Sequence, residues 1–372
     1  MWARRAACAL VGVVGVACLA PPPPIVVDTP YGVVRAASRG KADEVAELLT
    51  RLAPAVKTVL PGAQDREIDV WVQERLAVYR FHQRPDSVRG FTLLDAEFDA
   101  KRIHLQESGQ SPWYLAHELV HALIGPSWSP LPGILEEGLG DVIAERLNPE
   151  YEEHIRAHRL LNASAFTGGV ELEVVYREPG VGPWRQWPER TVSGILQVGG
   201  AVDPATLGEL LRTPRSDLHR RWADIPESFY GISWLIVSRM VERIGLDGLY
   251  DLCQRARDSG LELVPVAWIE EAAELDLEQL DPAFLASCFD RRALSTALFL
   301  QPEAFAEVAV DALAPLHGAL AFGDVYRRVR PAFRLGHASP VQVGMNSGPV
   351  YRSMRQAWQT LPQPLAGTTT AP

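Results

Sequence analysis

The pattern of hydrophobic and polar positions in the first third of the chain predicts one helix followed by a small sheet. Apolar residues recur at helical spacing across residues 41–60. Residues 68–73, 88–94 and 102–107 instead alternate between apolar and polar, which is the period of a half-buried strand. His104 lies in the last of these strands, where we expect it to be a surface or sheet-packing residue.

Helical spacing returns in two segments that a proline-rich turn separates. The first, residues 111–125, has Pro112 at a favourable first position and Gly125 at its end. The second covers residues 130–147 and ends before an Asn-Pro pair. The apolar residues of the first segment suggest a helix that buries one face and exposes the other.

The rest of the chain is predicted to be mostly helical, with one long loop. Residues 178–202 are rich in glycine, proline and tryptophan and are expected to form that loop. Residues 226–245 are apolar almost all round, which predicts a buried helix ending at Gly245. Helical patterns continue to about residue 295 and again between residues 302 and 333.

The first twenty residues predict export from the cytoplasm. Arg4 and Arg5 precede an apolar run from Ala6 to Ala20, which is short for a span of the bilayer. The segment also resembles a lipoprotein cleavage box with Cys18 as the lipidated residue, and an uncleaved membrane anchor is a third alternative. We therefore expect a periplasmic, cell-surface or secreted protein, with any membrane attachment confined to this segment.

Composition and charge favour a folded protein that acts on neither nucleic acid nor anionic membranes. The chain is 47% hydrophobic and 22% charged, and its formal net charge is −10. Such a charge opposes binding to phosphate-rich partners. Of the four cysteines, Cys253 and Cys288 lie outside the export segment, and they either pair or remain separate thiols.

The helix at residues 111–125 contains the H-E-x-x-H pattern as His117, Glu118 and His121. Each residue of a helix is rotated by about 100° from the one before it, so residues four apart lie on the same face. Two imidazoles at this spacing can bind one Zn²⁺, and the glutamate between them can act as general base on a metal-bound water.

A catalytic zinc needs a third protein ligand, for which the second helix provides candidates. Glu137 and Asp141 lie four residues apart, so Glu137 can complete the site while Asp141 accepts a hydrogen bond from a liganding imidazole. Glu136 competes for the ligand role, but the residue four positions after it is Gly140. Glycines inside a helix are unfavourable, and a close approach to a neighbouring helix explains them.

HELVHALIG followed by ILEEGLGDVIAE resembles the gluzincin zinc metallopeptidases, in particular their peptidase MA-like domains, over residues 42–290. The resemblance implies an α+β, thermolysin-like zincin fold, with a small N-terminal sheet, an active-site helix and a mostly helical C-terminal lobe. It implies one zinc held by His117, His121 and Glu137, with Glu118 as general base and Asp141 behind a ligand.

The same resemblance gives Tyr230 as a donor to the oxyanion, a role for which His219 is a weaker candidate. Two features depart from the family. The G-x-M-E-N aminopeptidase signature is missing, and fifteen residues between His121 and Glu137 are few.

The sequence thus predicts an exported zinc peptidase with a peptide or protein substrate. The alternative is a non-catalytic, exported zinc-binding or interaction protein on a peptidase scaffold, and hydrolysis of another amide is a third possibility. The expected domain organisation is an export signal at 1–20, a linker at 21–40, a peptidase domain at 41–295 (sheet and zinc helices 41–160, helical lobe 200–295), a helical extension at 296–335 and an irregular tail at 336–372.

Overall fold

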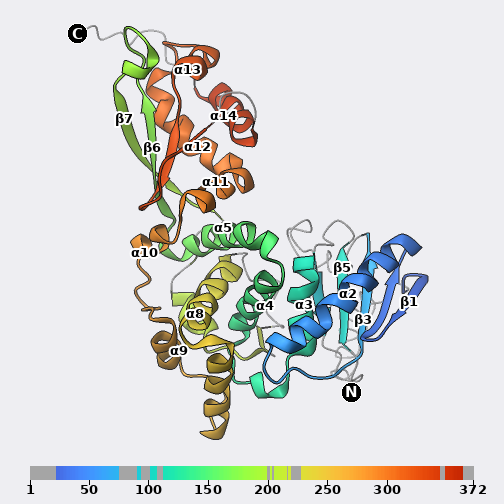
Figure 1. The fold of residues 1–372 in the computed structure, drawn as a ribbon. Helices are drawn as coiled ribbons and strands as arrows, with labels where there is room; N and C mark the ends of the chain where they lie inside the picture. Colours follow the sequence, from blue (N-terminus) through green and yellow to red (C-terminus); the bar gives the residue numbers. More distant parts are fainter. Residues whose placement is uncertain are drawn as a thin grey trace, which may run out of the picture. The chain divides into compact units, whose positions relative to one another are not determined.

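A computed structural model describes residues 22–74, 90–93, 101–106, 112–198, 202, 205–215, 217–218, 228–343 and 348–362, with the backbone alone at 90–93, 101 and 205. The protein is mixed α/β, with a small N-terminal sheet and a mostly helical remainder, as predicted (Figure 1). The predicted export segment lies outside the described residues. Among those described, no helix is both long and apolar enough to cross a bilayer.

The chain packs into two compact units that do not follow the predicted division into a sheet-bearing region and a helical lobe. Unit 1 comprises residues 1–151, 210–225 and 236–274. Unit 2 comprises residues 152–209, 226–235 and 275–372. The predicted helical lobe at 200–295 is therefore shared between the two units, because each unit is assembled from segments far apart in the sequence.

The N-terminal sheet of unit 1 has five strands in the order β1-β2-β3-β5-β4 (Figure 1). Strands β1 and β2 form an antiparallel hairpin, β2, β3 and β5 run parallel, and β4 is antiparallel to β5. The three strands expected from alternation are confirmed. The bounds are β1 (Ile25–Thr29), β2 (Gly32–Ala36), β3 (Ile68–Gln73), β4 (Gly90–Leu93) and β5 (Lys101–Gln106).

The predicted linker at residues 21–40 was wrong, since it contains both strands of the hairpin. Gly32 explains how the hairpin fits beside β3. Its φ is +136°, and a Cβ at this position would lie 2.0 Å from the carbonyl oxygen of Ile68. Only glycine allows the turn to approach the start of β3 so closely.

Helix α2 (Arg39–Val59) connects the parallel strands β2 and β3 and packs on the sheet (Figure 1). The Ser38 hydroxyl caps its first turn by accepting from the backbone N–H of Lys41. One stripe of the helix is buried at spacings of three and four residues, as the sequence pattern predicts. This stripe comprises Ala42, Val45, Ala46, Leu49, Leu52, Ala53 and Val56.

Among the α-helices whose bounds the described residues give, α3 (Pro112–Leu123), α4 (Gly133–Leu147) and α9 (Val266–Ala273) also lie wholly in unit 1. Helix α8 (Ser228–Asp258) contributes residues to both units. Gly245, where the sequence predicted the end of this helix, interrupts it with φ of 73°, and helical structure resumes afterwards.

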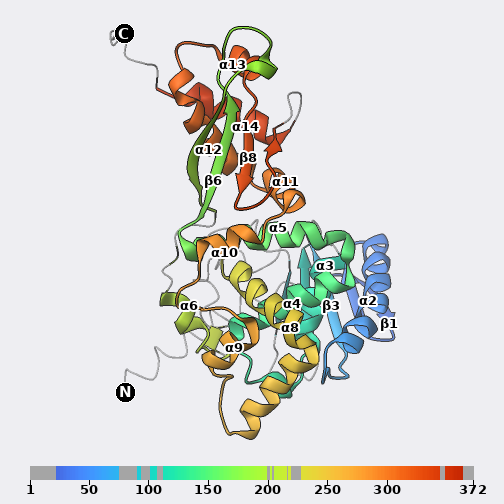
Figure 2. The same ribbon diagram turned by 60° about the vertical axis from the view of Figure 1, so that its left-hand side comes forward.

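Unit 2 contains a second sheet, of order β7-β6-β8-β9 and antiparallel throughout, which the sequence did not predict (Figure 2). Helix α12 packs on β6 and β7, and Phe305 of this helix meets Phe333 of β8 with ring centroids 5.4 Å apart. The strands are β6 (Val170–Arg177), β7 (Glu189–Leu196), β8 (Ala332–Leu335) and β9 (Val341–Gln342).

Two predictions for this part of the chain were wrong. The expected loop at 178–202 contains strand β7, and the expected irregular tail at 336–372 contains β9 and α14. Helices α12 and α13 lie within the predicted helical extension at 296–335, and β8 follows them. The remaining helices are α5 (Glu152–Ala163), α6 (Ala205–Leu210), α10 (Pro282–Ser287), α11 (Arg291–Leu300), α12 (Pro302–Leu313), α13 (Phe322–Arg328) and α14 (Pro349–Thr360). Short 3-10 helices are η3 (Pro126–Trp128), η4 (Pro149–Tyr151), η5 (Ser164–Thr167), η6 (Trp184–Gln186) and η8 (Ala314–Leu316).

The two cysteines beyond the export segment are not joined in a disulfide, so the alternative of separate thiols is confirmed. Cys253 is fully buried, and burial raises the pKa of its thiol to about 12. The thiol is therefore protonated at physiological pH and unreactive.

His104 is a packed sheet residue, as expected. Its Nδ1 lies 2.7 Å from Oε1 of Gln73 on the neighbouring strand, and its ring lies beside Trp71. Burial lowers the pKa of His104 to about 4; the charge of Arg102 adds to the shift and that of Asp69 opposes it. The imidazole is therefore neutral in the folded protein at neutral pH.

This lowered pKa predicts that acid destabilises the protein through His104. Between the unfolded pKa near 6.5 and about pH 4, the unfolded chain binds a proton that the folded protein does not. The free energy of unfolding should therefore fall by about 2–3 kcal/mol between pH 7 and pH 4.5 through this residue. Urea denaturation of the metal-free protein and of His104→Gln at both pH values measures it. Equal pH dependence in the two proteins would contradict the assignment.

Candidate metal centre

Helix α3 carries the H-E-x-x-H residues and is buried on all sides. Trp113 and every residue from Leu115 to Leu123 are buried, so the expected solvent-exposed face was wrong. The helix ends at Leu123, whose carbonyl accepts from the N–H of Gln64 at 2.8 Å. Gly125 lies just after the helix. Only glycine fits at this position, because a Cβ there would lie 2.5 Å from the carbonyl oxygen of Gly62. The turn after α2 therefore fixes the C-terminal end of the motif helix.

Helix α4 packs directly against α3 and brings the predicted acidic residues to the histidines. Gly140 makes this approach possible: a Cβ at this position would lie 2.8 Å from Nδ1 of His117. The sequence-based explanation of glycine by close helix packing is confirmed at this residue. Any larger residue would push the His117 ring out of place.

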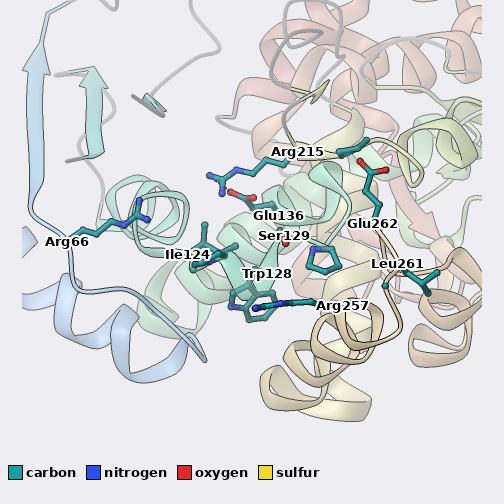
Figure 3. Close-up of a pocket in the computed structure, with 14 residues that line it drawn as sticks. Arg66, Ile124, Trp128, Ser129, Glu136, Arg215, Arg257, Leu261 and Glu262 are labelled. Carbon is teal, nitrogen blue, oxygen red and sulfur yellow. Dashed lines mark ion pairs between the residues drawn. The ribbon is translucent and has the colours of Figure 1, made fainter. Parts of the chain in front are cut away.

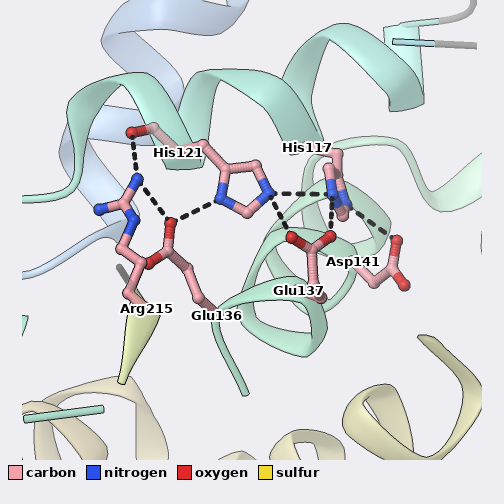
Figure 4. Close-up of polar contacts among 6 residues, drawn as sticks. All are labelled: His117, His121, Glu136, Glu137, Asp141 and Arg215. Carbon is pink, nitrogen blue, oxygen red and sulfur yellow. Dashed lines mark hydrogen bonds and ion pairs between the residues drawn. The ribbon is translucent and has the colours of Figure 1, made fainter. Parts of the chain in front are cut away.

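Three side chains converge on one point between the two helices (Figure 4). His117 Nε2 lies 3.2 Å from His121 Nε2 and 3.2 Å from Glu137 Oε2, and His121 Nε2 lies 3.4 Å from Glu137 Oε1. In a tetrahedral zinc site with bonds of about 2.0–2.1 Å, neighbouring donor atoms are about 3.3 Å apart. The two imidazole nitrogens therefore have the spacing of two corners of such a site, and each lies at a similar distance from a different carboxylate oxygen of Glu137.

Asp141 lies behind the first histidine, where the sequence placed it. The Nδ1–H of His117 donates to Asp141 Oδ1 at 3.0 Å, and Asp141 is completely buried. This bond leaves Nε2 as the ring nitrogen that faces Glu137. A carboxylate in this position fixes the tautomer and orientation of a metal-binding imidazole.

Glu136 has a role that the sequence did not reveal. It was considered as a rival ligand, but its Oε1 lies 2.6 Å from Nδ1 of His121, on the side of the ring away from Glu137 (Figure 4). Arg215 Nη2 lies 2.9 Å from the same oxygen and donates to the carbonyl of His121 at 3.3 Å. Each histidine thus has its own carboxylate, and an arginine holds the second one.

The signal for this arrangement is only partly present in the sequence. Neighbouring residues on a helix point about 100° apart. The adjacent Glu136 and Glu137 can therefore contact different ring nitrogens of the two histidines on the facing helix. Arg215 lies 94 residues after His121 in the chain, and no local pattern connects the two. Its contribution depends on the fold.

The charges of this cluster are strongly coupled. Burial alone would lower the pKa of His117, but its interactions with Asp141 and Glu137 outweigh burial and raise the pKa to about 9. Burial is likewise outweighed at His121, where Glu137 and Glu136 raise the pKa well above its ordinary value. At Glu137, burial would raise the pKa, but the two histidines lower it. The cluster therefore favours positively charged imidazoles beside an ionised Glu137 carboxylate.

Removing the charge of Glu136 should loosen metal binding without abolishing it. In Glu136→Gln the imidazole keeps a hydrogen-bond partner but loses its anionic one, so we expect zinc to dissociate about 10–100-fold faster. Stopped-flow transfer of zinc to a chromogenic chelator measures this rate. Glu145→Gln, on the same helix but outside the cluster, is the matched control. An unchanged rate in Glu136→Gln would contradict the orienting role.

The structure brings together four of the six predicted site residues, His117, His121, Glu137 and Asp141. Glu118 is buried on α3 directly after His117, at 7% exposure. Tyr230 belongs to unit 2, where the guanidinium of Arg159 lies 5.0 Å from its ring centroid. The catalytic roles of Glu118 and Tyr230 stay predictions, and His219 lies outside the described residues.

Comparison with protein-family models, with curated proteins and with solved structures gives no match. The resemblance to gluzincins therefore depends on the motif residues themselves, and membership of that family stays a prediction. What the described residues provide is a buried His117–His121–Glu137 group able to hold a metal ion.

Proposed function

We propose that this protein is an exported, zinc-dependent peptidase. The observation that carries the proposal is the buried His117–His121–Glu137 group, in which the two Nε2 atoms lie 3.2 Å apart and each lies 3.2–3.4 Å from a different oxygen of Glu137. Two nitrogen donors and one carboxylate are the ligand set of several hydrolytic zinc enzymes. Three protein ligands also leave one tetrahedral position for water.

The chain's own residues supply the remaining chemistry. Held by His117, His121 and Glu137, a zinc ion would lower the pKa of a bound water from about 15.7 towards 7 and would polarise the substrate carbonyl. Glu118 accepts a proton as the water oxygen forms a bond to the carbonyl carbon. It then donates this proton to the amide nitrogen as the C–N bond breaks. Asp141 and Glu136 hold the two imidazoles with Nε2 toward the shared point.

Chelation tests this function. The purified protein should contain one zinc per chain and cleave a generic peptide library, with cleavage lost on chelation and restored by zinc. Mass spectrometry of the products reads the bonds that are cleaved. One zinc per chain without cleavage of any peptide would support the interaction-protein alternative, and absence of zinc would contradict the proposal.

A further inference from the structure

A cavity of about 760 Å³ lies in unit 1 beside the metal centre. Its walls come from the turn after α3 (residues 124–130), Arg66 before β3, Glu136 of α4, residues 214–215 and residues 257–262 (Figure 3). This volume is within the usual range for pockets that bind small molecules or short peptide segments. The cavity shares Glu136 and Arg215 with the metal centre.

Three arginines line the cavity, in a protein whose net charge is −10. Arg215 is paired with Glu136, but Arg66 and Arg257 form no ion pair with any described residue; Arg257 donates to the hydroxyl of Ser127 at 3.3 Å. In Figure 3, Arg66 and Arg215 extend toward each other from opposite sides. The remaining carboxylate in the wall is Glu262. The residues that line the cavity thus carry a net positive charge.

The floor of the cavity is apolar and rigid. Trp128 is 2% exposed, donates its indole N–H to the carbonyl of Pro61 at 2.7 Å and packs on Tyr250. Ile124 and Pro130 adjoin it in the wall. An apolar surface with a few charged groups binds the aliphatic part of a ligand while the charges fix its polar end.

The cavity is close to the reacting centre. Glu136 lies in its wall, and the Oε1 atom of this residue is 2.6 Å from Nδ1 of His121. A single imidazole ring therefore separates the cavity wall from the point where the three donors converge.

We propose that this cavity binds one carboxylate of the peptide substrate, which deepens the proposed peptidase function and rests on it. Arg66 and Arg257 are the charges that recognise the carboxylate, since guanidinium groups suit carboxylates in geometry and charge. Trp128 and Ile124 contact the aliphatic carbons of the same residue. Glu262, in the same cavity, disfavours a second negative charge. The enzyme accordingly prefers peptides with an acidic residue or a free C-terminal carboxylate near the cleaved bond.

Calorimetry on the full-length, metal-stripped protein tests the cavity separately from catalysis. The probes are a capped alanine pentapeptide with glutamate at its centre, the same peptide with glutamine there, and an all-alanine pentapeptide with a free or an amidated C-terminus. The glutamate and glutamine peptides form one pair, and the peptides with a free and an amidated C-terminus form the other. In at least one pair, the peptide that carries the carboxylate should bind about tenfold more tightly than its partner. The pair that discriminates shows whether the carboxylate is a side chain or a C-terminus.

The double variant Arg66→Gln/Arg257→Gln should reduce this ratio to about one, whereas Arg51→Gln, an exposed arginine of α2 outside the cavity, should retain it. Circular dichroism verifies that each variant is folded. Equal binding within both pairs, absence of binding, or an unchanged ratio in the double variant would overturn the proposal. Discrimination by a protein that neither retains zinc nor cleaves peptides would instead contradict the peptidase function alone.

Discussion

Replacing Glu118 with Gln is expected to lower kcat for peptide hydrolysis by about 10²–10⁴-fold while one zinc per chain remains bound. The amide has nearly the same size as the carboxylate but cannot accept the proton of the attacking water. The metal should stay because its ligands are His117, His121 and Glu137, and Glu118 is not among them. Steady-state cleavage of a fluorogenic peptide together with metal analysis gives both quantities.

Glu47→Gln, an exposed glutamate of α2, is the control for purification and zinc loading. Its kcat and zinc content should equal those of the wild type. Turnover retained in Glu118→Gln would show that the general base is another group. Loss of zinc together with turnover would show that Glu118 contributes to the metal centre itself, which contradicts the division of roles proposed above.

Replacing Glu137 with Gln should have the largest effect on metal binding. Removal of a carboxylate behind a ligand already costs about 10–100-fold in zinc affinity, so loss of an anionic ligand should cost more than about 100-fold. Competition with a chelator of known affinity measures the change, with circular dichroism to confirm the fold.

The adjacent Glu136→Gln is the matched comparison, because it makes the same chemical change one residue earlier on α4. The geometry predicts the larger loss for Glu137, which faces Nε2 of both histidines, and the smaller loss for Glu136, which faces only Nδ1 of His121. The reverse order would make Glu136 the ligand and contradict the site as described.

The local part of the candidate site could be read from the sequence. Helical geometry alone places His117 and His121 on one face, and the same rule places Glu137 above Asp141. Gly140 within a helix indicated a close contact, and the contact is with the His117 ring. These inferences succeed because each depends on residues within about one turn of a helix.

The long-range part of the site could not be read in this way. Arg215 contacts Glu136 and the carbonyl of His121 because residues 210–225 belong to unit 1, although the preceding residues 152–209 belong to unit 2. Arg66 and Arg257 likewise line one cavity from positions far apart in the sequence. The spacing rules of helices and strands cannot identify partners that lie so far apart in the sequence.

Strands β7, β8 and β9 were missed for physical reasons, whereas the alternation of β6 is present in its sequence and was overlooked. Strand β7 is exposed along most of its length, so it lacks the apolar alternation of β3. Strands β8 and β9 have four and two residues, too few for a periodic pattern. Pairing of β6 with β8 joins residues such as Val174 and Phe333, and contacts of this range are determined by tertiary packing.

The most direct test of the account is anomalous X-ray diffraction at the zinc edge from crystals of the zinc-loaded protein. We predict one strong peak about 2.0–2.2 Å from Nε2 of His117, Nε2 of His121 and a carboxylate oxygen of Glu137. Absence of a peak between α3 and α4, or a peak whose ligands exclude Glu137, would contradict the metal centre on which the proposed function depends.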